Sequence, residues 1–251
     1  MRFKGLIFDK DGTLFHFQES WGDWLDEVLE ILSGDSIEKK QKMAYLLGFN
    51  LSRKKFLKGS PFIAGTTKEF LYTIEPFSKK LKGEALEKFI NSKLMTLTPK
   101  PVGDLRALFY YLKSKEIFIG VATNDNETPC RSQLEDAKII EFFDFIAGSD
   151  SGYGFKPETG QLEAFCKSLK LNVRDVAMVG DSTHDLIAAK KAGVHAIGVL
   201  TGVAEKKELD PYADIILTSI EDIPNYLNYF VDNFLYLFFF LVFIKIKNCL
   251  L

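Results

Sequence analysis

Short apolar runs alternate with helical patterns through the second half of this 251-residue chain, and that alternation constrains the fold most strongly. The runs are rich in β-branched and aromatic residues, which is typical of buried strands. They are Ile117–Ala122, Phe142–Ala147, Val176–Val179, Ala196–Leu200 and Asp214–Leu217. Helical patterns separate them at Val102–Lys115, Thr128–Lys138, Thr159–Leu169 and Asp185–Ala192. This order predicts an α/β fold, a doubly wound parallel sheet with helices on both faces, and an earlier run at Phe3–Phe8 should join it.

The stretch between Phe3–Phe8 and the later strands has a different pattern. Apolar residues from Trp21 to Leu32 recur every three or four positions, which predicts an amphipathic helix. Further helical patterns occupy Ile37–Leu47 and Glu84–Leu97. Thr66 and Glu69 have the spacing of a capping box and predict another helix, over Lys68–Ile74.

These patterns predict a second domain inserted into the first. We expect an all-helical cap domain over residues 17–96 and an α/β core made of residues 1–16 and 97–228. The expected hinges are Leu14–Gln18 and Leu97–Pro101. An inserted cap of this kind can open for substrate and close to exclude water.

Residues 229–251 form an apolar C-terminal tail that the core pattern does not include. Phe234–Ile244 is a run of eleven apolar residues, and Lys245 and Lys247 follow it. A helix that crosses a membrane needs about twenty such residues, so a full span is not expected. Two alternatives stay open: a packed or self-associating segment, and shallow contact with a membrane surface.

Composition excludes some classes of function. The net charge is −2, which gives no global electrostatic attraction to nucleic acid. The three cysteines lack CxxC spacing and are expected to be free thiols, as in a reducing cytoplasm, and the first apolar run is too short for a signal peptide. The three histidines are dispersed, which disfavours a zinc site. Composition does not determine the oligomeric state.

Two pairs of aspartates follow two of the predicted strands. Asp9 and Asp11 come directly after Phe3–Phe8, and Asp181 and Asp185 come after the run that ends at Val179. The carboxyl ends of parallel strands line the crevice where open α/β sheets bind ligands. Four carboxylates in one crevice need a compensating cation, and Mg²⁺ bound by carboxylates and a substrate phosphate meets that need.

The first pair has the residue types for phosphoryl transfer. Asp9 can attack phosphorus as a nucleophile and form an aspartyl-phosphate. Asp11 can protonate the leaving oxygen and later activate water. The simpler alternative for this segment alone is an Asp-Gly turn after an edge strand.

Two further segments can supply groups that bind phosphate. Thr123 and Asn124 follow the strand Ile117–Ala122, and their hydroxyl and backbone N–H can hold a phosphoryl oxygen. Lys156 follows a glycine-rich turn and can neutralise phosphate charge. Each has a structural alternative, a turn or cap for Thr123 and a solvated loop for Lys156. The order of all four segments, each placed after an apolar strand, favours the functional interpretation.

These segments together resemble the four motifs of the haloacid dehalogenase superfamily. The motif residues are Asp9-x-Asp11-Gly12-Thr13, Thr123, Lys156 and Gly180-Asp181-x-x-x-Asp185. The resemblance implies a Rossmann-like core, and the helical insertion is similar to that superfamily's C1-type cap. Lys156-Pro157-Glu158 and Gly180-Asp181-Ser182 resemble the branch of phosphoglycolate phosphatases and beta-phosphoglucomutases.

The resemblance assigns roles to individual residues. It implies Asp9 as nucleophile, Asp11 as general acid and base, and Thr123 and Lys156 as phosphate ligands. Asp9, the backbone carbonyl of Asp11 and Asp181 would hold Mg²⁺, and Asp185 would support these ligands through water or by orienting Lys156. Dehalogenases of the superfamily lack the second aspartate of the first motif, so Asp11 argues against dehalogenation.

The expected function is a Mg²⁺-dependent phosphatase for a small phosphorylated metabolite similar to phosphoglycolate. A sugar phosphomutase that uses the same intermediate is the first alternative, and a non-catalytic scaffold is the second. Arg53, Lys54 and Lys55 in the cap are either a site for an anionic substrate or a solvated charged face.

Overall fold

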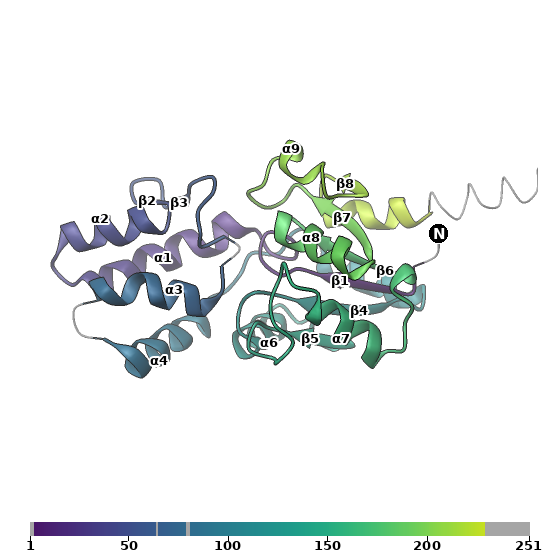
Figure 1. Cartoon of the computed structure of the whole chain (residues 1–251), viewed down its shortest axis with the longest axis horizontal. Helices are drawn as coiled ribbons and strands as arrows, with labels where there is room; N and C mark the ends of the chain where they lie inside the picture. The colour runs from purple at the N-terminus through teal and green to yellow at the C-terminus, as the bar shows by residue number, and fades with distance from the viewer. Residues whose placement is uncertain (1–2, 64, 79–80, 229–251) are drawn as a thin grey trace, which may run out of the picture.

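A parallel sheet with helices on both faces forms the larger part of the molecule (Figure 1). The computed structural model describes residues 3–63, 65–78 and 81–228. The sheet strands in these residues are β1 (Gly5–Phe8), β4 (Phe118–Ala122), β5 (Phe145–Ala147), β6 (Val176–Gly180), β7 (His195–Val199) and β8 (Ile215–Leu217). Their order across the sheet is β5-β4-β1-β6-β7-β8, and all neighbours are parallel. This order confirms the doubly wound fold, because the chain runs outward on one side of β1 and then on the other.

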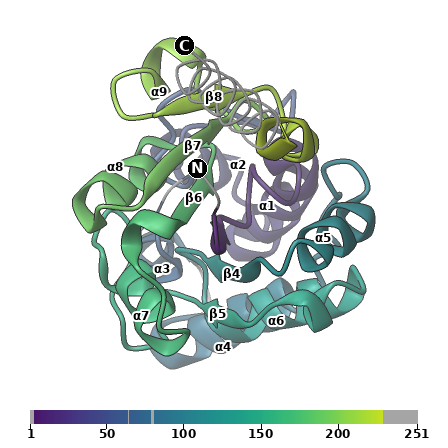
Figure 2. The ribbon, with the colours of Figure 1, turned by 90° about the vertical axis from the view of Figure 1, so that its right-hand side faces the viewer.

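Helices cover both faces of this sheet (Figure 2). Residues of α5 (Leu105–Ser114) and α6 (Glu127–Asp136) share one hydrophobic cluster with Leu6 and Phe8 of β1. Residues of α7 (Gly160–Ser168) and α8 (Thr183–Ala192) share another cluster with Ile7. Successive strand residues point to opposite faces, so the uninterrupted apolar runs of the sequence follow from burial on both sides. The core also contains the short helix α9 (Lys206–Leu209) and the 3-10 helices Ile140–Phe142, Val173–Asp175 and Ile220–Asp222, and residues 223–228 are helical.

One predicted strand is shorter than expected. We predicted Phe142–Ala147, but only Phe145–Ala147 pairs with β4. Phe142 ends a 3-10 helix, and its ring packs against Phe109 at a centroid distance of 5.8 Å. A short apolar run cannot by itself distinguish a buried helical turn from the beginning of a strand.

Most of the segment inserted after β1 is helical. Its helices are α1 (Phe17–Ser33), α2 (Ile37–Leu46), α3 (Thr67–Ile74) and α4 (Gly83–Leu94), with a 3-10 turn at Glu75–Phe77. The predicted capping box is present, because Glu69 donates its backbone N–H to the Thr66 hydroxyl and its carboxylate accepts the backbone N–H of Thr66. This box satisfies backbone donors that would otherwise lack a partner at the start of α3.

The expectation of an all-helical insertion was wrong in one detail. Two short strands, β2 (Phe49–Asn50) and β3 (Lys55–Phe56), pair antiparallel between α2 and α3. Phe49 and Phe56 lie opposite each other with ring centroids 5.0 Å apart, and both are buried in the core of the insertion. Strands of two residues are too short to show the alternation by which a strand is recognised in a sequence.

The insertion has a hydrophobic cluster of its own, whose buried members all lie in Phe17–Leu97. The two chain segments that enter and leave it run side by side, and His16 donates its backbone N–H to the carbonyl of Lys100 at 2.8 Å. We therefore propose that residues 17–96 form a cap domain on the α/β core.

The apolar run Phe234–Ile244 lies outside the described residues, as does Cys249. In the part of the chain that is described, no helix has the length and apolar character needed to cross a membrane. Cys130 and Cys166 are buried free thiols, one in α6 and one in α7.

Candidate active site

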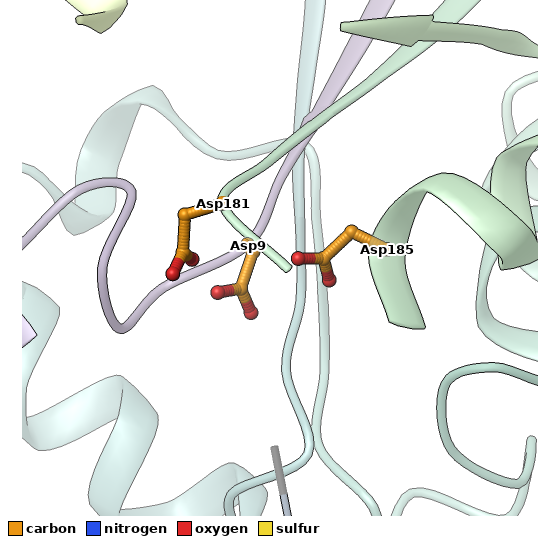
Figure 3. A group of neighbouring side chains, drawn as sticks. All are labelled: Asp9, Asp181 and Asp185. Atoms are coloured by element: carbon orange, nitrogen blue, oxygen red, sulfur yellow. The ribbon is translucent and has the colours of Figure 1, made fainter. Parts of the chain in front are cut away.

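Three aspartates meet at the carboxyl end of the central strands (Figure 3). Asp9 follows β1, and its backbone N–H donates to the carbonyl of Val179 on the neighbouring strand β6. Asp181 follows β6 directly, and Asp185 lies in the first turn of α8. All three are buried, and each offers an oxygen within 4.8 Å of those of the others.

Local backbone structure positions the side chains of Asp185 and Asp181 beside Asp9. Ser182 caps α8, because its hydroxyl accepts the N–H of Asp185 while the Asp185 carboxylate accepts the N–H of Ser182. This reciprocal cap fixes the Asp185 side chain at the helix N-terminus. Gly12 has a φ of +87°, and a Cβ there would lie 2.4 Å from an Asp181 oxygen. The glycine of the first motif is therefore required both by the turn and by the close approach to Asp181.

Lys156 links two of the three carboxylates. Its Nζ lies 2.5 Å from Asp9 Oδ1 and 2.6 Å from Asp185 Oδ1, and the side chain is almost completely buried. The Asn124 side chain holds the lysine backbone, since it accepts the N–H of Lys156 and donates to the Lys156 carbonyl, both at 2.9 Å. The side chain of Asn124 thus positions Lys156.

Burial dominates the electrostatics of this group. It raises the pKa of Asp9 to about 7 despite the nearby Lys156, and it raises the pKa of Asp181 well above its ordinary value. Burial alone would lower the pKa of Lys156, but the charges of Asp185 and Asp9 outweigh it and raise that pKa. Three ionised carboxylates and one ammonium would leave a net charge of about −2, which a divalent cation can compensate.

The donor set fits a hard cation. The candidate ligands are carboxylate oxygens, without histidine or thiolate in the group. Mg²⁺ takes such oxygens and usually completes its coordination with water and substrate phosphate. Asp181 also receives the Thr13 hydroxyl at 3.2 Å, which fixes one of its oxygens.

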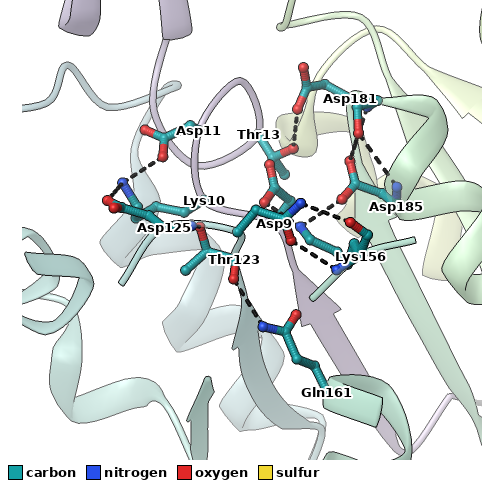
Figure 4. Close-up of polar contacts among 12 residues, drawn as sticks. Asp9, Lys10, Asp11, Thr13, Thr123, Asp125, Lys156, Gln161, Asp181 and Asp185 are labelled. Atoms are coloured by element: carbon teal, nitrogen blue, oxygen red, sulfur yellow. Dashed lines mark hydrogen bonds and ion pairs between the residues drawn. The ribbon is translucent and has the colours of Figure 1, made fainter. Parts of the chain in front are cut away.

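The Asp11 side chain lies apart from the three-carboxylate group (Figure 4). One of its oxygens lies 2.6 Å from Lys10 Nζ, and the other accepts the indole N–H of Trp21 at 2.7 Å. Trp21 belongs to α1, so a residue of the insertion holds the side chain of the first motif's second aspartate. Asp11 nevertheless lines the same cavity as Asp9. The predicted metal contact of Asp11 was its backbone carbonyl, and that remains a proposal.

Sequence reasoning missed the buried lysine of the first motif. Lys10 has no exposed surface, and its Nζ also lies 3.4 Å from Asp125 Oδ2 and donates to Gln133 at 2.6 Å. Burial by itself would lower the pKa of Lys10, but Asp11 and Asp125 outweigh it and raise that pKa. A lysine between two aspartates at a buried strand end was the available signal. For Asp125 the sequence offers no signal beyond its position directly after Asn124.

Thr123 lies at the end of β4, next to β1 (Figure 4). Its hydroxyl accepts the N–H of Asp125 at 3.1 Å, and its carbonyl accepts the side-chain amide of Gln161 at 2.9 Å. An oxygen that accepts this bond can still donate its own hydrogen to a phosphoryl oxygen. Gln161, in α7, is a further residue that sequence reasoning missed.

A cavity of about 870 Å³, its open mouth included, lies between the core and the insertion. Its core side contains all seven residues predicted for the site, Asp9, Asp11, Thr123, Asn124, Lys156, Asp181 and Asp185. Its other side comes from the insertion, chiefly from aromatic and aliphatic side chains. Arg53, Lys54 and Lys55 are exposed and are not among its described lining residues.

The family model of the haloacid dehalogenase-like hydrolases matches residues 6–199. The chain belongs to this family. A phosphoglycolate phosphatase of Neisseria meningitidis serogroup A is 33% identical over 135 residues, which make up 54% of this chain and 53% of that protein. The match therefore spans about half of that relative. A phosphoglycolate phosphatase of Rhodospirillum rubrum is 26% identical over 212 residues, 81% of this chain and 82% of that protein.

Solved structures agree with the family's fold. The HAD phosphatase from Thermococcus onnurineus has a TM-score of 0.65 at 21% identity, covering 89% of this chain and 97% of that one. CbbY from Rhodobacter sphaeroides, solved in complex with phosphate, has a TM-score of 0.64 at 19% identity, covering 87% and 95%. At these identities the likeness establishes the fold alone.

Proposed function

We propose that the chain is a Mg²⁺-dependent phosphatase that hydrolyses a small phosphate ester through an aspartyl-phosphate on Asp9. One observation carries the proposal: Asp9, Asp181 and Asp185 converge on a cavity with a single lysine among them. A structural ion pair does not need three buried carboxylates for one ammonium group. A site that takes up a cation together with a phosphate does, because the two ligands balance the charge.

The first step makes the phosphoenzyme. A carboxylate oxygen of Asp9 forms a bond to phosphorus as the bond from phosphorus to the ester oxygen breaks. Lys156, 2.5 Å from Asp9, would neutralise charge on the transferring group. The leaving oxygen takes a proton from the Asp11 carboxyl and departs as an alcohol.

The second step hydrolyses the phosphoenzyme. Asp11, now a carboxylate, accepts a proton from water while the water oxygen attacks phosphorus and the bond from Asp9 to phosphorus breaks. Inorganic phosphate and the carboxylate of Asp9 result, and Asp11 is protonated again. Both roles require Asp11 to face the cavity, whose lining includes it.

The remaining site residues bind the phosphoryl group and the metal ion or orient Lys156. Thr123 and the backbone N–H of Asn124 are proposed to hold phosphoryl oxygens. Asp9, Asp181 and the carbonyl of Asp11 are proposed to hold Mg²⁺, which when bound would supply positive charge beside the phosphoryl oxygens. Asp185 is proposed to orient Lys156, in agreement with their 2.6 Å contact. Phosphoryl transfer requires mainly such positioning and charge stabilisation.

The test is phosphate release from a panel of small esters, with Mg²⁺ and with EDTA, beside the Asp9→Asn variant. The names of the relatives make phosphoglycolate the first compound to include. Release that requires Mg²⁺ and disappears in Asp9→Asn would support the proposal. A folded protein that releases no phosphate from any ester would refute it, and transfer between sugar hydroxyls without release would identify a mutase instead.

A further inference from the structure

The wall that the insertion contributes to the cavity is aromatic. Phe62 contacts the rings of Trp21, Phe70 and Trp24 at centroid distances of 5.3, 5.2 and 6.2 Å. All four side chains line the cavity. Trp21, Trp24 and Phe70 are each less than a tenth exposed, so their rings are fixed by packing rather than free to rearrange.

This wall has no basic side chain among the residues that the structure describes in the insertion. The lysine of the described lining is Lys156 and the histidine is His184, and both belong to the core. Several basic groups of the insertion form ion pairs with acidic residues of the insertion, among them Lys40, Lys54 and Lys93. Lys58 forms ion pairs with Glu205 and Glu208 and lines a neighbouring cavity, to which Lys156 and Asp181 also contribute.

The polar side chains of the wall already have hydrogen-bond partners within the protein. The Glu69 carboxylate accepts both the backbone N–H and the hydroxyl of Thr66 within its capping box. The hydroxyl of Thr67 donates to Asp125 at 3.2 Å. A substrate with many hydroxyls would find few partners here, and a substrate carboxylate would lie near Glu69 with no counter-charge.

We propose that the natural substrate is a phosphate monoester of an uncharged, apolar alcohol, with an aromatic ring or a branched hydrocarbon that packs against Phe62, Trp24 and Phe70. The inference rests on the proposed phosphatase function and names its substrate class. Lys156 and the proposed cation receive the phosphate, while the wall of the insertion removes the apolar part of the alcohol from water. A carboxylate in that position, as in phosphoglycolate, is disfavoured because it loses its hydration without gaining a partner.

The first experiment compares four esters, of which benzyl and 4-carboxybenzyl phosphate are the pair whose leaving alcohols differ by one carboxylate. Benzyl phosphate, 4-carboxybenzyl phosphate, phosphoglycolate and methyl phosphate are assayed for phosphate release with Mg²⁺ and the wild-type chain. We expect kcat/KM for benzyl phosphate to exceed that for each of the two carboxylates by at least about tenfold, since burying an unpaired charge is costly. Methyl phosphate reports on the phosphoryl site alone.

A pair of variants tests the wall itself. Phe62→Leu removes the central ring of the wall, and we expect it to raise KM for benzyl phosphate about fivefold or more, with little change for methyl phosphate. Phe49→Leu is the matched control, because Phe49 is buried in the same cluster but is not among the described lining residues. It should leave both substrates unchanged.

The outcomes separate the two proposals. No release from any of the four esters would overturn the phosphatase function, and the substrate class with it. Release with phosphoglycolate or 4-carboxybenzyl phosphate equal to or better than benzyl phosphate would overturn the substrate class alone. An equal response of Phe62→Leu and Phe49→Leu would also overturn it, because the effect would then come from loosening of the insertion rather than from the wall.

Discussion

Trp21 of the insertion donates its indole N–H to the carboxylate of Asp11 in the core, with 2.7 Å between Nε1 and Oδ1. The Lys10 ammonium holds the other Asp11 oxygen at 2.6 Å and lies 5.4 Å from the centre of the Trp21 ring. The proposed general acid and base is thus held from both domains. A contact of this kind makes the position of a catalytic side chain depend on where the insertion sits.

Trp21→Phe should lower kcat for methyl phosphate by about tenfold or more, because the loss of a hydrogen bond to a charged group is typically worth about 1.5–3 kcal/mol. Phenylalanine keeps one aromatic ring at this buried position but removes part of the packed volume, so the Tm of the variant is measured beside kcat. The measurement is a double-mutant cycle with Asp11→Asn. If Trp21 acts through Asp11, Trp21→Phe will have almost no further effect in the Asp11→Asn background. A full tenfold effect in that background would show that Trp21 acts by another route.

Asp9→Asn should abolish phosphate release without loss of the fold. Burial raises the pKa of Asp9 to about 7 from an ordinary 3.8, so the ionised carboxylate is unfavourable in the folded chain when no cation is bound. We therefore expect Asp9→Asn to have a Tm equal to or above that of the wild type in EDTA at about pH 8. Added Mg²⁺ should raise the Tm of the wild type and have a much smaller effect on the variant. A variant with substantial residual turnover would remove Asp9 as the nucleophile.

The sheet and its helices could be predicted because their patterns are local. Each strand of the core shows as a run of apolar residues, since burial on both faces leaves no polar positions within it. The capping box at Thr66 and Glu69 was equally local and was confirmed. The pair Phe49–Asn50 and Lys55–Phe56 was missed, because two-residue strands depend on contacts within the folded insertion rather than on a repeat in the sequence.

The convergence of Asp9, Asp181 and Asp185 could be expected from strand ends alone. The contacts between the insertion and the core could not be predicted from the sequence. Nothing near Trp21 in the sequence indicates that its indole reaches Asp11, since a tryptophan on the apolar face of a helix is ordinarily a packing residue. The burial of Lys10 has the same origin, because its partner Asp125 comes from another strand end and becomes a neighbour only after the sheet forms.

Mg²⁺ binding should weaken as the pH falls through about 7. Asp9 is a proposed ligand, and burial raises its pKa to about 7, so protons compete with the cation below that pH. The direction follows from the raised pKa of Asp9. Protonated Asp9 stabilises the cation-free fold at low pH, and this stabilisation is lost as the pH rises from about 4 to about 7. A bound cation offsets the loss by pairing with the ionised carboxylate. Isothermal titration should give an affinity at about pH 6 that is about tenfold weaker than at about pH 8. The raised pKa of Asp181 acts in the same direction. Equal affinities at the two pH values would contradict the assignment of Asp9 as a ligand.

Lys10→Met should destabilise the chain far more than the loss of an exposed lysine. Lys10 is completely buried between Asp11 and Asp125, so its removal leaves two buried carboxylates without their cation. Removing one partner of a buried ion pair typically costs about 3–5 kcal/mol in the free energy of unfolding. The matched control is Lys88→Met, which breaks the exposed pair with Glu84 and should cost less than about 1 kcal/mol. Urea unfolding of both variants at neutral pH gives the comparison. A Lys10→Met variant as stable as Lys88→Met would mean that Asp11 and Asp125 are not held as a charged pair by Lys10, and the anchoring of Asp11 from the core would have to be abandoned.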